Sequence, residues 1–291
     1  MRVMLDNSIF AHSQFAEAAK GPQGPCFGAK NQHHLVCGFI RKKLDPSIEY
    51  QAQKDALFTI GRLIREKAFE AFTYQELMYE KMRRTIGENV FDALDGCRLT
   101  RCPPAIERSR FQMGNFFEFA RKGGKKDQKR DAKTELGQIA FMKMLCSLDE
   151  GGIRCILGMK AVLGLPDFEV ESFRELKCFQ GLCAISQSPE HYPDMFHLWT
   201  TQRNHIDVFL TLEKKLPEIA KTIENSRKIK VGYPTRVLRP LQFLESLGVT
   251  NADPVPIEPG RFYPFIEVWD SWYRSHRYVE EQPTDSTALR D

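Results

Sequence analysis

The sequence has no apolar run long enough to cross a bilayer, and its first ten residues, MRVMLDNSIF, lack the apolar core of a secretory signal. These two absences argue against a membrane-embedded or secreted protein. We therefore predict a cytoplasmic protein with no membrane partner. Hydrophobic residues make up 42% and charged residues 27% of the 291 residues, an ordinary globular composition. That length suits one large domain or two smaller ones, and no linker sequence marks a boundary.

The eight cysteines lack the spacing of a zinc site. Two pairs, Cys97/Cys102 and Cys178/Cys183, share a C-x4-C spacing that is wider than the usual zinc knuckle, and no histidine pair at ligand spacing completes either one. Thiols in the cytosol stay mostly reduced, and free cysteine is among the most often buried residue types. We expect buried structural cysteines here.

The sequence also lacks a strong excess of either charge. Its formal net charge of +4 is compatible with a polyanionic partner but does not require one. A glycine-interrupted stretch nevertheless gathers seven cations, and such a run is commonly a solvated loop. The seven are Arg121, Lys122, Lys125, Lys126, Lys129, Arg130 and Lys133.

Short apolar runs alternate along the chain with helical patterns. Strands are expected at 2–5, 68–73, 208–210 and 236–238, and a further one in CRLTRCPPAIERSRF that Pro103 and Pro104 stop. Helices are expected at 51–67, 74–84, 133–147, 168–185, 194–204, 213–226 and from 240. The glycine- and proline-containing stretch 21–45 is interpreted as an irregular connection or an edge element. Strands alternating with helices imply parallel pairing and right-handed crossovers. The predicted fold class is therefore α/β, a three-layer α/β/α sandwich with a mainly parallel sheet.

Four carboxylates occupy related positions in this pattern. Asp6, Asp194 and Glu213 stand at strand ends or helix starts on the carboxyl-terminal side of the sheet, and Glu76 comes early in a helix that follows another strand. Carboxylates crowded at one edge repel and raise each other's pKa, and a divalent cation removes that cost. Oxygen ligands select Mg²⁺ or Mn²⁺, whose chemistry suits phosphodiester hydrolysis.

Each of these acids also has a purely structural interpretation. Asp6 and Asp194 suit helix N-caps, a position where aspartate is strongly preferred. Glu213 suits the first turn of a helix, where it complements the helix dipole. Glu76 suits a solvated helix surface. Periodicity and spacing alone do not choose between the two interpretations.

Four sequence blocks, taken in order, resemble PIN domains. VMLDNSIF resembles the family's first strand and its D-x-S/T motif, here Asp6 and Ser8. AFTYQEL resembles the second block, a strand leading to a helix with an early glutamate, here Glu76. RVLRPLQFLESLGV is similar to the family's last strand and helix.

The remaining block, PDMFHLWTTQRNHIDVFLTLEKKL, is the most specific. Family members have an aspartate at the start of a helix and then a strand that ends in T-x-D. Here the aspartate is Asp194, and Thr211 follows it by 17 positions, close to the family's usual gap. Glu213 replaces the last aspartate of T-x-D. The longer side chain either still reaches a metal or marks a weakened site.

The resemblance implies a metal-dependent endoribonuclease with Mg²⁺ or Mn²⁺ as cofactor. Asp6, Asp194 and Glu213 would hold the cation, and Glu76 would complete the acidic cluster. Ser8 and Thr211 would orient ligands or water as supporting hydroxyls. A toxin-like nuclease with a protein inhibitor, or a homo-oligomer, is compatible with the same resemblance.

The resemblance covers the two ends of a PIN-like domain at 1–249, with a poorly matched helical insert at 87–190. Residues 250–291 form a C-terminal extension that is expected to dock on the body and then fray, partly disordered. RNA would follow a cationic rim, for which Arg121, Lys122, Lys125, Lys126 and Lys214 are the candidates. The alternative is a catalytically weakened PIN-like module that binds RNA or protein, which the Glu213 departure and the long insert favour.

Overall fold

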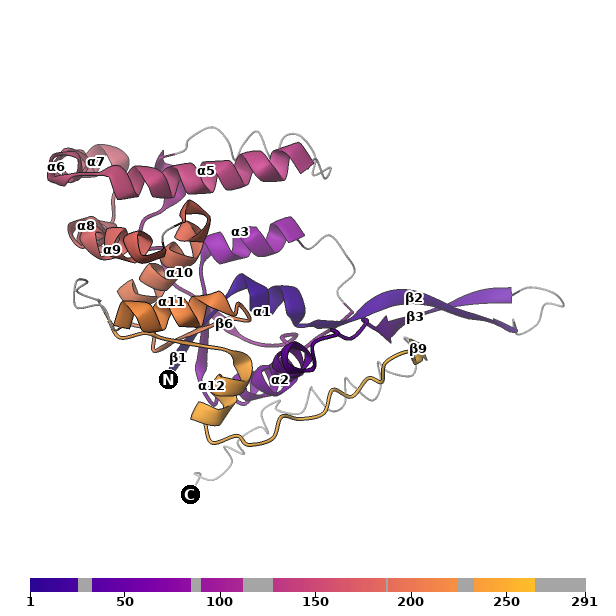
Figure 1. Cartoon of the computed structure of the whole chain (residues 1–291). Helices are drawn as coiled ribbons and strands as arrows, with labels where there is room; N and C mark the ends of the chain where they lie inside the picture. The colour runs from indigo at the N-terminus through magenta and orange to yellow at the C-terminus, as the bar shows by residue number, and fades with distance from the viewer. Residues whose placement is uncertain (26–32, 85–89, 112–127, 187, 225–232, 265–291) are drawn as a thin grey trace, which may run out of the picture. The chain divides into compact units, whose positions relative to one another are not determined.

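The structure is a computed structural model that describes residues 1–25, 33–84, 90–111, 128–186, 188–224 and 233–264 (Figure 1). The chain divides into two compact units, which we describe separately. The first unit comprises Met1–Ser13, Pro46–Gly87 and Ala93–Pro254. The second comprises Gln14–Asp45, Glu88–Asp92 and Val255–Asp291. None of the helices in the described ranges is both long enough and apolar enough to span a membrane.

The first unit is built on a five-stranded sheet in which every pairing is parallel, in the order β6-β4-β1-β7-β8. Its strands are β1 (Arg2–Leu5), β4 (Glu70–Thr73), β6 (Leu99–Arg101), β7 (Val208–Leu210) and β8 (Arg236–Leu238). All three residues of β7, and Val3 to Leu5 of β1, are fully buried. Strands covered on both faces are apolar throughout, as these two are. The predicted α/β class and mainly parallel sheet are confirmed, and the arrangement is compatible with a three-layer fold.

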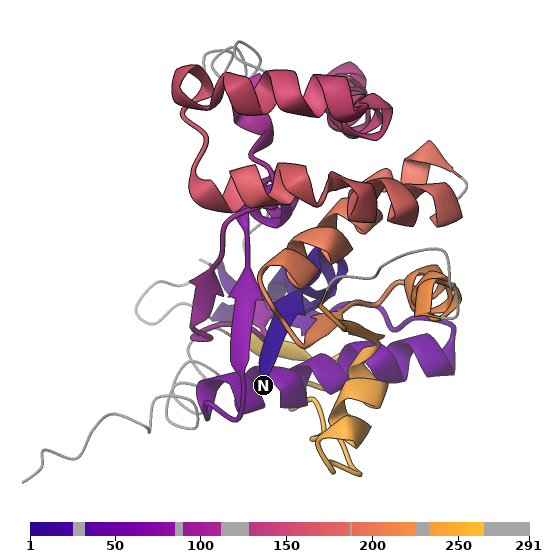
Figure 2. The ribbon, with the colours of Figure 1, turned by 90° about the vertical axis from the view of Figure 1, so that its left-hand side faces the viewer.

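Helices pack around this sheet. Helices α2 (Ile48–Arg65) and α12 (Pro240–Ser246) contact each other on one side of the strands. Helices α10 (Tyr192–Arg203) and α11 (Lys215–Glu224) lie on the other side, as do the shorter α1 (Asn7–His12) and α3 (Gln75–Arg84) (Figures 1 and 2).

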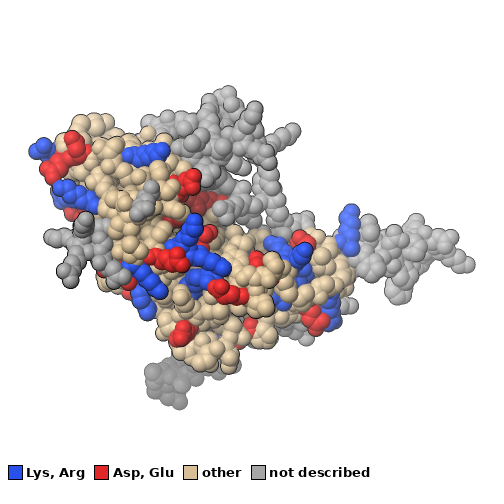
Figure 3. All heavy atoms as spheres, in the orientation of Figure 1, with Lys and Arg blue, Asp and Glu red and all other residues tan. Residues whose placement is uncertain are grey.

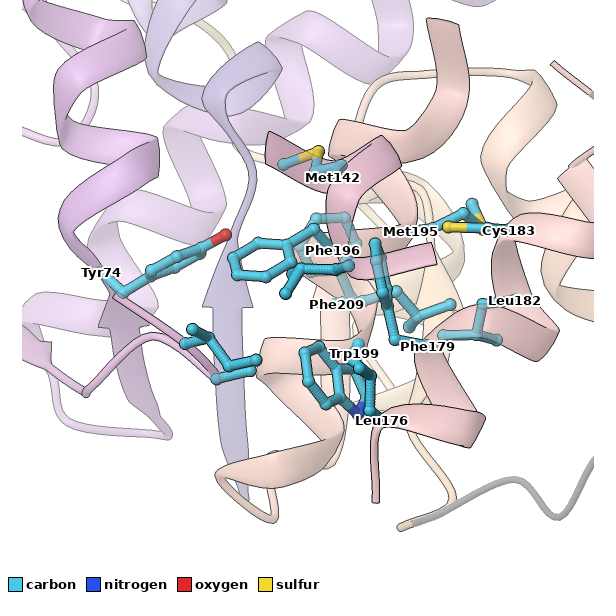
Figure 4. Close-up of a cluster of buried hydrophobic side chains, with 14 of the residues drawn as sticks. Tyr74, Met142, Leu176, Phe179, Leu182, Cys183, Met195, Phe196, Trp199 and Phe209 are labelled. Carbon is cyan, nitrogen blue, oxygen red and sulfur yellow. The ribbon is translucent and has the colours of Figure 1, made fainter. Parts of the chain in front are cut away.

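The stretch that the sequence marks as an insert adds a layer of helices to the first unit. Its elements are η1 (Arg108–Phe111), α5 (Gln128–Ser147), α6 (Glu150–Gly158), α7 (Lys160–Leu163), α8 (Asp167–Arg174), α9 (Leu176–Ser186) and η2 (Pro189–His191). The single helix expected at 168–185 is in fact two, because α8 ends at Arg174, with Glu175 as its C-cap, before α9 begins at Leu176. Phe179 of α9 packs against Phe196 and Trp199 of α10, and these rings form part of the main core (Figure 4).

The second unit contains an antiparallel sheet in the order β5-β2-β3-β9. Its strands are β2 (Gln14–Pro25), β3 (His33–Arg41), β5 (Val90–Asp92) and β9 (Phe262–Pro264). The irregular connection expected at 21–45 was therefore wrong, since much of that stretch forms a long strand pair. The pairing register shifts between Lys20 and Gln23, which accommodates the glycine and proline residues there. These residues are the reason that the sequence predicts no strand in this stretch. Gly38 is required there, because a Cβ would lie 2.3 Å from the carbonyl oxygen of Tyr263 on β9.

The described cysteines form no disulfide. Cys183 is buried, whereas Cys97, Cys102 and Cys178 are half-buried. Burial raises the pKa of Cys102 to about 12, so this thiol stays protonated at neutral pH. Of the two cysteine pairs singled out in the sequence, only Cys183 is fully buried, so the expectation of buried cysteines is confirmed for that residue alone.

Candidate active site

The order of the strands defines where a ligand is expected. In the sheet, β1 lies between β4 and β7. The strand that follows β1 along the chain in this sheet, β4, lies on one side of β1, whereas the later β7 and β8 lie on the other side, so the strand order reverses between β1 and β7. Open α/β sheets bind ligands in the crevice at such a switch point. Asp6 directly follows β1 and Thr211 directly follows β7, and the Asp6 backbone N–H donates to the Leu210 carbonyl at 3.0 Å.

Two hydroxyl groups hold the Asp6 carboxylate. Ser8 Oγ donates to Asp6 Oδ2 at 2.5 Å, and Thr211 Oγ1 donates to the same oxygen at 2.8 Å. Asp6 is also the N-cap of α1 and accepts the backbone N–H of Ser8 at 3.4 Å. The hydrogen bonds made to this carboxylate by described residues all reach Oδ2. Its other oxygen, Oδ1, is therefore the one available to a ligand.

The direction of these hydrogen bonds is fixed by the backbone. Ser8 Oγ accepts the N–H of Leu212 at 3.0 Å, and Thr211 Oγ1 accepts the N–H of Glu213 at 3.0 Å. A hydroxyl that accepts in this way directs its own proton elsewhere, and here the proton goes to Asp6. The ends of β1 and β7 are thus cross-linked through one buried carboxylate. The structural interpretation of Asp6 as an N-cap is therefore confirmed, and this role still leaves one carboxylate oxygen available.

Asp194 lies in the first turn of α10, where its Oδ2 is 3.6 Å from Nδ1 of His191. Burial is the main cause that raises its pKa to about 6, although 36% of the side chain remains exposed. His197 and His191 oppose this rise, whereas the negative charges of Asp6 and Glu213 add to it. The charges of Asp6 and Glu213 therefore act on Asp194 in the same direction as its burial.

A buried histidine accompanies these acids. His197, one turn after Asp194 on α10, is 2% exposed. Its Nδ1 is hydrogen-bonded to the hydroxyl of Tyr74, and its Nε2 lies 3.2 Å from Oε1 of Glu80. Burial alone would lower the pKa of His197, but Glu80, aided by Asp6 and Asp194, raises it to about 9. This site therefore holds a buried imidazolium at neutral pH.

Glu76 is 5% exposed and is not a solvated helix residue. Its carboxylate is held by Arg108 of η1, whose Nε and Nη2 donate to it at 3.0 to 3.2 Å. The side chain of Arg108 is 14% exposed, so both charges of this pair are largely desolvated. Arg108 satisfies both oxygens of Glu76, which leaves this acid less available to a metal than Asp6 is.

Glu213 differs from the other acids because it is exposed and precedes α11. Lys214 beside it is 57% exposed and lies 3.8 Å from Glu49. The other proposed RNA contacts, Arg121, Lys122, Lys125 and Lys126, lie outside the described residues. On the face drawn in Figure 3, the described cations alternate with acids instead of gathering into one basic surface.

The carboxylate oxygens of this site are the ligand type that Mg²⁺ and Mn²⁺ prefer, but the described residues do not surround an ion completely. Within the described ranges, no three His, Cys, Asp or Glu side chains converge closely enough to hold a metal ion. Mg²⁺ commonly keeps several waters and uses one or two protein carboxylates. Asp6, with its available Oδ1, can supply one such carboxylate and the partly exposed Asp194 is the candidate for the second, whereas Glu213 is exposed.

Sequence reasoning missed three residues of this site. Tyr74, Glu80 and Arg108 carry no signature of their own, because their roles depend on how η1, α3 and α10 pack. The sequence does contain a weak signal for the histidine of this site. His197 follows Asp194 by three residues on the same helix, a spacing that places two side chains on one face.

Comparisons with family models, curated proteins and solved structures gave no match. The resemblance to PIN domains therefore remains a prediction that rests on the order of the motifs.

Proposed function

We propose that this protein is an endoribonuclease that depends on Mg²⁺ or Mn²⁺. The observation that carries the proposal is the Asp6 carboxylate at the switch point, held through one oxygen by Ser8 and Thr211. A carboxylate fixed in this way is pre-oriented for a ligand on its other oxygen. Burial raises the pKa of Asp194 and the negative charge of Asp6 adds to that rise, which supports the proposal that both carboxylates meet one cation.

The residues have distinct roles in this proposal. Asp6 and Asp194 would hold the cation, and Glu213 would join them when its side chain turns inward. The bound ion would supply positive charge for the attacking and leaving oxygens of a phosphodiester. Ser8 and Thr211 keep Asp6 in place, and His197 offsets negative charge from within the protein. Glu76 would not bind the cation directly, because its carboxylate is ion-paired with Arg108.

RNA is proposed as the substrate because the motif order resembles nucleases of that class. The net charge of +4 and the exposed Lys214 are compatible with a polyanion. A protein inhibitor or a second copy of the chain remains a candidate partner.

A second candidate function is a weakened PIN-like module that binds RNA or protein without cutting. Two observations favour it. Glu213 is exposed, and the described residues offer no group of three metal ligands. The pairing of Glu76 with Arg108 adds to this, since an arginine satisfies the acid that a metal would otherwise use.

The deciding experiment measures cleavage of labelled single-stranded RNA with Mn²⁺ by the wild type and by Asp6→Asn and Asp194→Asn. Asp167→Asn is the matched control, because Asp167 is an exposed acid on α8 outside the site. We expect the two site variants to lose cleavage and the control to retain it. Cleavage that survives both site variants would reject the nuclease proposal. Salt-sensitive RNA binding without cleavage, unchanged in both variants, would support the second candidate.

A further inference from the structure

Two cysteines that the candidate active site does not use lie on helices that pack together. Cys146 is near the end of α5, and Cys183 is on α9. The side-chain amide of Gln180 donates to the carbonyl oxygens of Leu145, Cys146 and Leu148 at 3.1, 3.4 and 2.8 Å. Gln180 and Cys183 are three positions apart, a spacing that places two side chains on one face of a helix. The face of α9 that carries Cys183 therefore packs against the end of α5 that carries Cys146.

The two thiols differ in burial and in ionisation. Cys183 is 3% exposed and belongs to the main core (Figure 4), whereas Cys146 is half-buried and packs against that core. A hydrogen bond with Cys183 is the main cause that lowers the pKa of Cys146. The same hydrogen bond, together with burial, raises the pKa of Cys183. Cys146 is therefore the thiol of the pair that ionises first, and Cys183 keeps its proton.

This asymmetry is typical of reactive thiol pairs. The thiolate is the nucleophile, so a partly exposed cysteine with a lowered pKa is the one that a peroxide oxidises. A second cysteine beside it then resolves the oxidised product into a disulfide. Cysteines that only fill space in an apolar core have raised pKa values, and Cys146 departs from that pattern.

We propose that Cys146 and Cys183 form a redox-active dithiol that a peroxide oxidises to a disulfide. The Cys146 sulfur attacks one oxygen of hydrogen peroxide and the O–O bond breaks. This step leaves a sulfenic acid on Cys146 and one water, formed with the proton that the Cys146 thiol released. The Cys183 sulfur then attacks the Cys146 sulfur, the S–O bond breaks, and hydroxide leaves with the Cys183 proton as a second water. The two thiols lose two electrons, which reduce the peroxide. The proposal goes beyond the nuclease function, because it requires neither Asp6 nor a metal.

The experiment treats the reduced, full-length protein with a small molar excess of hydrogen peroxide in the absence of metal. The remaining thiols are then alkylated, and the protein is digested without reductant for peptide mass analysis. We expect one peptide pair joined through Cys146 and Cys183, lighter by two hydrogen atoms than the two reduced peptides together and separated by dithiothreitol. Recovery of both cysteines as alkylated thiols, a disulfide from either one to a different cysteine, or a link that forms only in urea would overturn the proposal.

Variants test the two roles. Cys183→Ala removes the hydrogen bond and the resolving thiol, so a sulfenic acid on Cys146 should accumulate and be trapped by dimedone. It should form at least about threefold more slowly than the wild-type disulfide, because the pKa of Cys146 is no longer lowered. In Cys146→Ala, Cys183 should remain a free thiol, and a dimedone adduct on Cys183 at the wild-type rate would overturn the assignment.

Matched controls keep the test specific. Cys155→Ala, at an exposed cysteine of α6, should retain the disulfide between Cys146 and Cys183. Asp6→Asn should retain it as well, so a failure of the nuclease proposal leaves this one standing. If Cys183→Ala does not fold, the peptide map of the wild type still decides the outcome, because it needs no substitution in the core.

Discussion

The imidazole of His197 and the carboxylate of Glu80 form a buried pair, with Nε2 3.2 Å from Oε1, although the two residues are 117 positions apart. Gln138 of α5 donates to the same Glu80 oxygen at 3.0 Å, and Tyr74 binds the other imidazole nitrogen. The pair therefore ties α10, which carries Asp194, to α3 and α5. It also supplies a positive charge next to an acidic site.

This pair predicts a specific dependence of stability on pH. The pKa of His197 is about 9 in the folded protein, against an ordinary value of 6.5. A raised pKa contributes stability that is complete below pH 6.5 and is lost as pH rises towards 9. We expect the free energy of unfolding to fall by at most about 3 kcal/mol across that window. Chemical denaturation at several pH values measures it.

The matched variants for this prediction are His197→Gln and His12→Gln. His197→Gln should flatten the stability profile between pH 6.5 and 9, because no titrating group remains at that position. His12 is half-buried against Tyr50, and its replacement should retain the slope. A slope that persists in His197→Gln would assign the titration to another group.

The two hydroxyl groups that donate to Asp6, those of Ser8 and Thr211, predict linked effects on stability and metal affinity. Thr211→Val removes one donor to a buried carboxylate, so we expect a loss of about 1–3 kcal/mol of stability. Loss of such a supporting contact should also weaken Mn²⁺ binding roughly 10- to 100-fold. Thr222→Val, on the exposed face of α11, is the control. Titration calorimetry with Mn²⁺ measures the metal affinity, and thermal unfolding measures the stability. If the Thr211 hydroxyl had no role in metal binding, Thr211→Val would change stability alone.

The buried pair of Arg108 and Glu76 predicts strong non-additivity. Arg108→Met leaves a desolvated carboxylate unpaired and should cost about 3–5 kcal/mol. The double variant Arg108→Met/Glu76→Leu removes both charges and should recover much of that loss. Lys177→Met, which breaks an exposed pair with Glu150, should cause no measurable change. A double-mutant cycle by urea unfolding measures the coupling, and additive effects would show that the pair is not energetically coupled.

The raised pKa of Asp194 predicts that metal binding depends on pH. A carboxylate must be ionised to bind a cation, and Asp194 ionises with a pKa of about 6. We expect Mn²⁺ affinity to be constant above about pH 7 and to fall up to tenfold per pH unit below 6. Asp194→Asn should remove this dependence along with much of the affinity. A midpoint near pH 4 in the wild type would contradict the assignment.

The sequence predicts the central sheet better than its surroundings. Val208–Leu210 and Arg236–Leu238 were placed to the residue, because short apolar runs bounded by polar residues mark buried strands clearly. The pairing of Gln14–Pro25 with His33–Arg41 was missed, because glycine and proline usually indicate a break and here lie next to a register shift. Local signals describe local structure, so features set by long-range pairing escape them.

The same distinction applies to the candidate site. The resemblance gives Thr211 a supporting role beside the acids, and in the structure Thr211 Oγ1 donates to the Asp6 carboxylate at 2.8 Å. The contact of Tyr74 with His197 joins residues 123 positions apart on elements whose packing no local pattern encodes. A strand-end rule therefore predicts which residues lie at the carboxyl edge of the sheet. It does not predict the partners that neutralise them.

The departure from T-x-D predicts a gain-of-function variant. Glu213→Asp creates the T-x-D pattern of PIN domains with a shorter side chain, whose carboxylate is held closer to the backbone that Thr211 already fixes. If Glu213 is exposed because its side chain is too long to settle beside Asp6, the shortened variant should bind Mn²⁺ several-fold more tightly and cleave RNA faster. Glu218→Asp, the same change on the surface of α11, is the control. Weaker Mn²⁺ binding in Glu213→Asp would instead show that the longer side chain reaches the ion, and the exposed position would then be a resting arrangement of an active nuclease.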